Sequence, residues 1–250
     1  MSTNTKKLTG KVAVVTGGSK SIGAAIARRL AADGAAVALT YASSPQKANE
    51  VVSAIEADGG RALAIHADSA DVEAVKNAIA ETVRTFGRLD ILVNNAGIIA
   101  LGLIDEFSLE AFDRLVAVNI RGVFVATQEA ARHMGEGGRI IMIGSVNSDL
   151  MPFAGGSVYA LTKAAVAGFT RGLARDLGPR GITVKNIPPG PVDTELNPDD
   201  GPFAESLKKI MALPRYGQSD EVAGLVSYLA SAEAGFITGA GLKIDGGFAA

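Results

Sequence analysis

The chain of 250 residues contains no cysteine and no tryptophan, and only two histidines, His66 and His133. Without cysteine, disulfides, thiolate nucleophiles and sulfur-ligated metals are all excluded. The two histidines are far apart in the sequence and have no neighbouring cluster of ligand side chains, so we expect no metal site. A lack of cysteine is also compatible with the reducing cytoplasm.

The sequence also lacks an excess of charge of either sign and a long hydrophobic run. It has 24 Lys and Arg against 26 Asp and Glu, a formal net charge of -2, so no basic stripe indicates binding to nucleic acid or to an anionic membrane. The longest apolar run, AGIIALGLI, is far shorter than the ~20 residues of a membrane-spanning helix. The polar start MSTNTKKLTG lacks the apolar core of a signal peptide. We therefore expect a soluble cytoplasmic protein whose partner is a small molecule.

Short apolar runs alternate with amphipathic helical patterns over most of the chain. The seven runs are VAVVT, AAVALT, RALAIHA, LDILVNN, GRIIMIGS, GITVKNI and LKID. Several are almost wholly apolar, as parallel strands buried on both faces are. The alternation predicts an α/β fold, a single Rossmann-type domain over residues 1–250 with a doubly wound sheet of about seven parallel strands and helices on both faces. We interpret residues 1–9 as an N-terminal tail.

Residues 188–218 interrupt this alternation. Five of the nine prolines lie between Pro188 and Pro202, and Pro214 follows. A long irregular segment in a compact domain is usually either functional or disordered. We interpret residues 188–218 as a lid over the substrate and call them the lid segment.

The stretch TGGSKSIG, Thr16 to Gly23, lies between the first predicted strand and a helical pattern. A glycine turn that opens a helix points backbone N–H groups and the positive helix end at an anion, which is how pyrophosphate is bound. Gly17 allows the sharp turn and Gly23 allows close packing of the helix on the strand, whereas Ser21 stands where the backbone should approach the phosphates. At a negative φ, the Ser21 side chain would cap the helix or donate to a phosphate.

Three residues indicate acid–base chemistry at a carbonyl or an alcohol. Tyr159 and Lys163 share one face of a predicted helix, so we expect the ammonium group to lower the pKa of the phenol from its ordinary value of about 10. Ser145 follows the run RIIMIG at the carboxyl end of a buried strand, where active sites of such sheets lie. The run NNAG, residues 94–97, ends another strand with two amides that can bind backbone or ligand. Each motif alone also fits a polar turn or a surface contact.

Taken together, these motifs resemble a classical short-chain dehydrogenase/reductase. The resemblance extends from KVAVVTGGSKSIG to FITGAGLKIDGG, with the glycine turn, NNAG, VNIRGVF, the serine, Y-x-x-x-K and PPGPVDT in the order of the family. It implies four catalytic residues. Tyr159 would be the general acid in reduction and the general base in oxidation, and Ser145 would hydrogen-bond the substrate oxygen. Lys163 would hold the nicotinamide ribose, and Asn119 would anchor a water that relays protons to it.

The resemblance also implies a nicotinamide dinucleotide cofactor. An NAD-preferring member would carry an acidic residue after the second strand, but the segment VALTYASSPQKA has none and places Tyr41 there. Lys20, Ser43 and Ser44 would instead meet a 2′-phosphate, which favours NADP(H) over NAD(H). The implied cofactor-binding residues are Gly17, Ser19, Lys20, Ser21, Ile22, Gly23, Tyr41, Ser43, Ser44, Asp68, Ser69, Asn95, Ala96, Gly97, Tyr159, Lys163, Pro189, Gly190, Val192 and Thr194.

The expected substrate pocket is mostly apolar, which favours reduction of a moderately hydrophobic ketone to a secondary alcohol by direct hydride transfer. The main alternative is a 3-oxoacyl-thioester (acyl-carrier-protein or CoA) reductase, although RHMGEGGRI offers little clustered basic charge for an acidic carrier. A remote alternative is a catalytically silent nucleotide-binding scaffold. The expected pocket residues are Ile98, Ser145, Val146, Asn147, Phe153, Leu196, Phe203 and Met211.

Two further positions depart from the family pattern. Lys185 stands where the family more often has asparagine, and we interpret it as a surface lysine at a strand end. Pro188 doubles the proline before the PGPVDT motif and restricts Ile187. The C-terminal run FITGAGLKIDGGFAA matches the end through which the family usually assembles, so the resemblance also implies a homotetramer.

Overall fold

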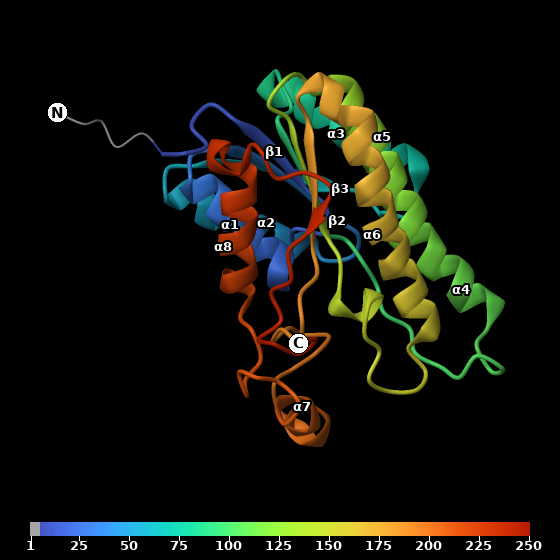
Figure 1. Ribbon diagram of the computed structural model, residues 1–250. Helices are drawn as coiled ribbons and strands as arrows, with labels where there is room; N and C mark the ends of the chain where they lie inside the picture. The colour runs from blue at the N-terminus through green and yellow to red at the C-terminus, as the bar shows by residue number, and fades with distance from the viewer. Residues whose placement is uncertain (1–5) are drawn as a thin grey trace.

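The computed structural model describes residues 6–250. Its centre is one sheet of parallel strands in the order β3-β2-β1-β4-β5-β6-β7 (Figure 1). The strands are β1 (Val12–Val15), β2 (Ala36–Tyr41), β3 (Arg61–His66), β4 (Ile91–Asn94), β5 (Arg139–Ile143), β6 (Thr183–Ile187) and β7 (Ala240–Gly241). The strand order reverses between β1 and β4, and ligands of such sheets bind beyond the carboxyl ends of the strands at this point.

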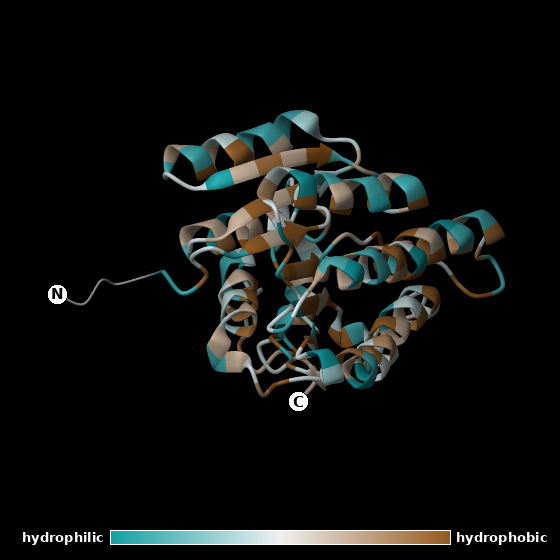
Figure 2. Ribbon diagram, turned by 90° about the horizontal axis from the view of Figure 1, so that it is seen from above, coloured by the Kyte–Doolittle hydropathy of each residue, from teal (hydrophilic) through white to brown (hydrophobic). Residues whose placement is uncertain are grey.

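Helices cover both faces of the sheet. One face carries α1, α2 and α8, and the other carries α3, α5 and α6 (Figure 1). The helices are α1 (Ser21–Ala32), α2 (Pro45–Ala57), α3 (Val72–Phe86), α4 (Leu109–Val116), α5 (Val123–His133), α6 (Ser157–Leu177), α7 (Gly201–Lys208) and α8 (Ser219–Ala230). A π-helical turn, η1 (Ala117–Gly122), joins α4 to α5. In the view from above, most strands are tan to brown, whereas the helices alternate between brown and teal (Figure 2).

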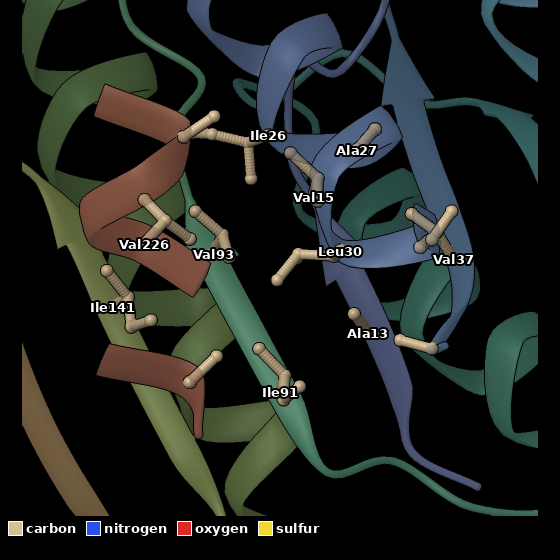
Figure 3. Close-up of a cluster of buried hydrophobic side chains, with 14 of the residues drawn as sticks. Ala13, Val15, Ile26, Ala27, Leu30, Val37, Ile91, Val93, Ile141 and Val226 are labelled. Carbon is tan, nitrogen blue, oxygen red and sulfur yellow. The ribbon is translucent and has the colours of Figure 1, made fainter. Parts of the chain in front are cut away.

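The side chains of the central strands alternate between two core layers. On β1, Ala13 and Val15 pack with Ile26 and Leu30 of α1 (Figure 3), whereas Val14 belongs to the opposite layer. Strands that are buried on both faces need apolar side chains at every position, which explains why these runs show no polar alternation. The predicted fold class, a doubly wound parallel sheet with helices on both faces, is confirmed.

The seventh strand lies earlier than LKID, residues 242–245. The paired residues are Ala240 and Gly241, and beyond them only an isolated bridge joins Ile244 to Pro189. Ile244 still donates its N–H to the Pro188 carbonyl, 3.2 Å away. Pro188 and Pro189 have no N–H to return, so the regular ladder ends there.

Two segments that the sequence predicts as irregular are partly ordered. The lid segment contains α7, which lies beyond the end of the sheet (Figure 1). Several of its apolar side chains form a separate cluster with residues outside it, and we call this the lid cluster: Val146, Ala204, Leu207, Met211, Tyr216 and Phe248. Of the predicted tail 1–9, residues 1–5 lie outside the described residues. Leu8 is buried in the core and donates its N–H to the Asp33 carbonyl, so the packed chain begins before residue 9.

The interpretation of Lys185 as a surface residue is wrong. Lys185 lies within β6 with 0% of its surface exposed. Its Nζ atom donates to Thr183 Oγ1 at 2.6 Å and to the Leu229 carbonyl, near the end of α8, at 2.9 Å. Burial lowers the pKa of Lys185 to about 7, and the charge of the neighbouring Arg139 contributes to this. The long side chain reaches the α8 carbonyl across the core layer, which sequence spacing does not reveal.

This burial predicts a pH-dependent stability. Between pH 7 and 10.5, the ordinary pKa of lysine, the unfolded chain binds the Lys185 proton and the folded chain releases it. The free energy of unfolding should therefore rise with pH through this window, and Lys185→Met should remove the rise. Urea unfolding at pH 7 and pH 10 measures the difference between wild type and variant.

The matched control is Lys76→Met, which changes a lysine on α3 that pairs with Glu73 at the surface. The difference in the free energy of unfolding between this variant and wild type should be nearly the same at both pH values. Parallel pH profiles for wild type and Lys185→Met would contradict the prediction.

Candidate active site

The glycine turn between β1 and α1 is held by β2. The N–H of Gly17 donates to Thr40 Oγ1 at 3.1 Å, and the N–H of Gly18 donates to the Thr40 carbonyl at 2.9 Å. The residue before α1, Lys20, has no side-chain cap on the helix. The first N–H groups of a helix have no intrahelical partner, so this turn presents them to an anion.

Gly23 is required by close packing inside the turn. A Cβ atom at this position would overlap with the Gly17 carbonyl oxygen and would lie 2.5 Å from Asn95 Nδ2. The absence of a side chain therefore lets α1 begin directly against β1 and β4, as the sequence predicts.

Ser21 does not meet the condition of a negative φ under which its side chain would cap the helix or donate to a phosphate. Its φ is +48°, in the left-handed region, and among the described residues it is the only residue other than glycine with a positive φ. Left-handed backbone is strained for a residue with a Cβ atom. The turn keeps the conformation that glycine would favour, although it carries serine.

The end of β4 is tied to the end of β1 by four hydrogen bonds. Asn95 Nδ2 donates to the carbonyls of Thr16 at 2.9 Å and Gly17 at 3.0 Å. Thr16 Oγ1 accepts from the N–H groups of Asn95 and Ala96, both at 3.0 Å. Thr16, which the sequence did not single out, thus aligns the NNAG run with the glycine turn.

Asn119 lies in the π-helical turn η1 and connects it to the same loop. Its Oδ1 atom accepts from the Ile98 N–H at 2.9 Å, and its Nδ2 atom donates to the Ile98 carbonyl at 2.9 Å. Nδ2 also lies 3.1 Å from Thr162 Oγ1 of α6. A Cβ atom at Gly97 would lie 3.5 Å from both Asn119 Oδ1 and Lys163 Nζ. Asn119 and Lys163 therefore converge on the space that Gly97 leaves open.

Tyr159 and Lys163 lie on α6, where they face Ser145 at the end of β5. Lys163 is 7% exposed, and its Nζ atom donates to the Ile143 carbonyl at 3.1 Å and lies 5.8 Å from the centroid of the Tyr159 ring. The Ser145 hydroxyl bonds with Asn147 Oδ1 at 2.9 Å and also reaches Tyr159. The three predicted side chains thus share one site.

The expectation that Lys163 lowers the pKa of Tyr159 is wrong. Burial raises the pKa of Tyr159 above its ordinary value, and the hydrogen bond with Ser145 opposes this only in part. Burial also lowers the pKa of Lys163 to about 8. Because burial disfavours the charged form of both residues, the phenol retains its proton at neutral pH.

A cavity of about 450 Å³ runs from the glycine turn to the lid segment. It brings together most of the predicted residues: Gly17, Ser19, Lys20, Ser21, Ile22, Gly23, Tyr41, Ser43, Ser44, Asn95, Gly97, Ile98, Ser145, Tyr159, Lys163, Pro189, Gly190, Val192, Thr194 and Leu196. Its wall also contains residues that the sequence did not identify: Ala42, Ile99, Ile143, Gly144 and Asn197. Four of these neighbour a predicted residue in the chain, and Ile143 lies two positions before Ser145.

Other predicted residues lie outside the wall of this cavity. Asp68 Oδ2 pairs with Arg114 at 2.9 Å, and the Ser69 backbone packs against Gly122. Neither Ala96 nor Asn119 lines the cavity, although both bond to residues at its edge.

The structure brings only some of the predicted substrate-pocket residues to the wall of this cavity. Val146 and Met211 are buried in the lid cluster, behind the cavity. Phe153 and Phe203 contact each other edge to face, with ring centroids 5.6 Å apart. Asn147 bonds with Ser145 and donates to the Leu150 carbonyl at 3.3 Å. Ser145, Leu196 and Ile98 remain as wall residues.

Two negative findings concern residues 6–250. In that part of the chain, no group of three or more His, Cys, Asp or Glu side chains is placed to hold a metal ion. No helix between these residues is long and apolar enough to cross a membrane.

A glycine turn at a helix N-terminus that opens into a cavity with tyrosine, serine and lysine is the arrangement of a Rossmann-type oxidoreductase. A family model described as enoyl-(acyl carrier protein) reductase matches residues 6–249. The chain belongs to the short-chain dehydrogenase/reductase family, as the sequence motifs predict.

Solved structures and a curated relative agree with this assignment. A short-chain dehydrogenase/reductase from Serratia marcescens is 60% identical, with a TM-score of 0.97 over 98% of this chain and 100% of that chain. A short chain dehydrogenase from Burkholderia cenocepacia, crystallised in complex with NADP, is 55% identical and has a TM-score of 0.96. The match covers 98% of this chain and 100% of that chain. The cyclic-di-GMP-binding biofilm dispersal mediator protein of Escherichia coli is 50% identical over 242 residues, 97% of this chain and 98% of that protein.

The strained backbone of Ser21 predicts that Ser21→Gly stabilises the protein. Relief of about 1–2 kcal/mol of left-handed strain exceeds the entropy of about 0.4–1 kcal/mol that glycine adds to the unfolded chain. We expect the free energy of unfolding to rise by about 0.5–1 kcal/mol, measured by urea denaturation.

Ser19→Gly is the control, because Ser19 lies in the same turn without a positive φ. That variant should lose stability. If Ser21→Gly also lowers the free energy of unfolding, the prediction is contradicted. The serine side chain would then stabilise the fold by more than the left-handed strain destabilises it.

Proposed function

We propose that this protein is an NADP(H)-dependent carbonyl reductase that interconverts a ketone and a secondary alcohol. The observation that carries the proposal is the shared cavity. Tyr159, Ser145 and Lys163 line the same space as the uncapped N-terminus of α1. A substrate carbonyl beside Tyr159 and a dinucleotide on the glycine turn would therefore be in contact.

The chain's own residues account for the acid–base part of the reaction. Tyr159 retains its proton because burial raises the pKa of its phenol, so it donates that proton to the carbonyl oxygen in reduction. Ser145, whose hydroxyl donates to Asn147 Oδ1 and which lines the cavity with Tyr159, orients the same oxygen. Lys163 lies beside the Tyr159 ring and binds the ribose, while Asn119 positions the loop above it.

The residues present fit a dinucleotide. Gly17 and Gly23 let the turn pack closely against Ala96 and Asn95, and both glycines line the cavity. The N-terminus of α1 supplies N–H donors to the pyrophosphate. When bound, the nicotinamide supplies or accepts the hydride. Pro189, Gly190, Val192 and Thr194 line the far end of the cavity, where they would contact the carboxamide.

The cavity favours the phosphorylated cofactor. Tyr41, Ser43 and Ser44 at the end of β2 and Lys20 in the turn all face it. None of these side chains is acidic, so none accepts from the ribose hydroxyls as an NAD-selective carboxylate does. A relative crystallised with NADP supports the same choice.

The wall near Tyr159 favours a hydrophobic ketone as substrate. Ile98, Ile99 and Leu196 line it, and apolar walls with a few polar groups are typical of such pockets. A 3-oxoacyl-thioester reductase remains the alternative. For that activity we expect a cationic docking surface, yet Arg132 is paired with Glu129 and Arg139 is 9% exposed. A homotetramer stays a prediction from the family resemblance, and a cytoplasmic location stays a prediction from the composition of the sequence.

Tyr159→Phe tests the reaction. Removal of the proton donor should lower kcat/KM for ketone reduction about 10²- to 10⁴-fold and leave the dissociation constant of NADPH nearly unchanged. The measurement is NADPH oxidation with a panel of hydrophobic ketones and acetoacetyl thioesters, together with fluorescence titration of NADPH.

Tyr228→Phe on α8 is the control, because it removes a partly exposed phenol outside the cavity. A wild-type protein that binds NADPH and reduces no carbonyl would favour the silent scaffold. Preference for the thioesters would favour the alternative reductase.

Lys20→Ala tests the cofactor. If Lys20 meets the 2′-phosphate, the variant should bind NADPH about 10-fold more weakly, because hydrogen bonds to charged groups contribute about 1.5–3 kcal/mol. NADH binding should change little. Lys243→Ala, which changes a lysine paired with Asp149, is the control. Equal weakening of both cofactors would contradict the assignment.

A further inference from the structure

Ion pairs join the lid segment to the nucleotide side of the site. The carboxylate of Glu195 lies between two lysines: its Oε2 atom is 3.7 Å from Lys20 Nζ, and its Oε1 atom accepts a hydrogen bond from Lys47 Nζ. Lys20 belongs to the glycine turn, and Lys47 lies in the first turn of α2. Glu195 directly follows Thr194, a wall residue of the cavity. Three segments far apart in the sequence thus meet at one carboxylate.

This carboxylate lies at the edge of the cofactor cavity. Glu195 and both lysines line a second cavity of about 420 Å³. The second cavity shares Ser19, Lys20 and Ser21 with the larger one. Lys20 therefore lines the same cavity as Ser43 and Ser44, where the 2′-phosphate is expected, and Lys47 lies in the first turn of the helix that Ser44 precedes.

The charges that line the second cavity are balanced, and Glu195 is the anion that pairs with both Lys20 and Lys47. The wall of this cavity contains the cations Lys20, Arg28 and Lys47, and the anions Glu50, Glu195 and Asp220. The hydrogen bond from Lys47 keeps the pKa of Glu195 below its ordinary value, so the carboxylate is charged at neutral pH. Removal of this one charge leaves a cationic site.

We propose that Lys47 binds the 2′-phosphate of NADP(H) together with Lys20, and that Glu195 competes with this phosphate for both lysines. The inference rests on the proposed cofactor. A phosphate monoester carries more negative charge than a carboxylate and offers more acceptor oxygens, so it displaces Glu195. The lid segment next to Glu195 is then released from the glycine turn and from α2. NAD(H), which has a hydroxyl there, leaves these ion pairs in place.

Lys47 is not among the cofactor-binding residues predicted from the sequence, which at this end of β2 are Tyr41, Ser43 and Ser44. A lysine three residues later, at the start of the next helix, was the available signal. Its pairing with a residue 148 positions away in the chain has no sequence signature.

Binding of adenosine 2′,5′-bisphosphate and 5′-AMP to the full chain isolates the 2′-phosphate. By calorimetry at low salt, Lys47→Met should weaken the bisphosphate about 3- to 10-fold and Glu195→Gln should tighten it about 2- to 5-fold, as expected for exposed ion pairs. Neither variant should change 5′-AMP binding. In the double variant, Glu195→Gln should tighten bisphosphate binding less than it does in the otherwise wild-type chain, because Lys47 and Glu195 act on one site.

Lys76→Met on α3 and Glu205→Gln on α7 are the matched controls, since they make the same charge changes in surface pairs. The inference is overturned if Lys47→Met weakens both nucleotides equally or neither, or if Glu195→Gln fails to tighten the bisphosphate. Wild-type protein that binds the bisphosphate no better than 5′-AMP would overturn the cofactor proposal itself. If the wild-type protein binds the bisphosphate as expected and reduces no ketone, the proposed reaction is contradicted, whereas the cofactor proposal and the inference about Lys47 and Glu195 are not.

Discussion

The hydrogen bonds between Asn95 and the ends of β1 are the constraint on which the site depends. They fix the glycine turn to the loop after β4 at the point where the strand order reverses. One side of this junction is the packed contact of Gly23 with Gly17, which sets the start of α1. The other side is Gly97, beside Lys163. A single amide therefore links the end that would hold phosphates to the end that would carry out proton transfer.

Lys163 and Lys185 are both buried, and neither pairs with a carboxylate within residues 6–250. The two lysines lie in different surroundings. Burial lowers the pKa of both, to about 8 for Lys163 and about 7 for Lys185. Lys163 is held by the Ile143 carbonyl at the wall of the cavity, where a ligand can reach it. Lys185 is held by Thr183 and by the Leu229 carbonyl of α8, within the core. Of the two, only Lys163 lines the cavity.

The sequence was sufficient for the architecture and for the residues at strand ends. Parallel strands buried on both faces produce apolar runs, and the motifs follow these runs directly, so Ser145 and Asn95 could be placed without coordinates. Features that depend on a distant partner could not be predicted. The burial of Lys185 needs the end of α8, and the raised pKa of Tyr159 needs the dry pocket around it. The conformation of Ser21 is imposed by the turn and not by its own preference.

The lid cluster gives the end of the chain a role in the site. Phe248 packs with Tyr216 and Met211 of the lid segment and with Val146, which directly follows Ser145. The backbone N–H of Val146 also donates to the Pro189 carbonyl, at the start of the lid segment. The surroundings of Ser145 are therefore shared among three distant parts of the chain, so a substitution near the C-terminus can reshape them while Ser145, Tyr159 and Lys163 stay unchanged.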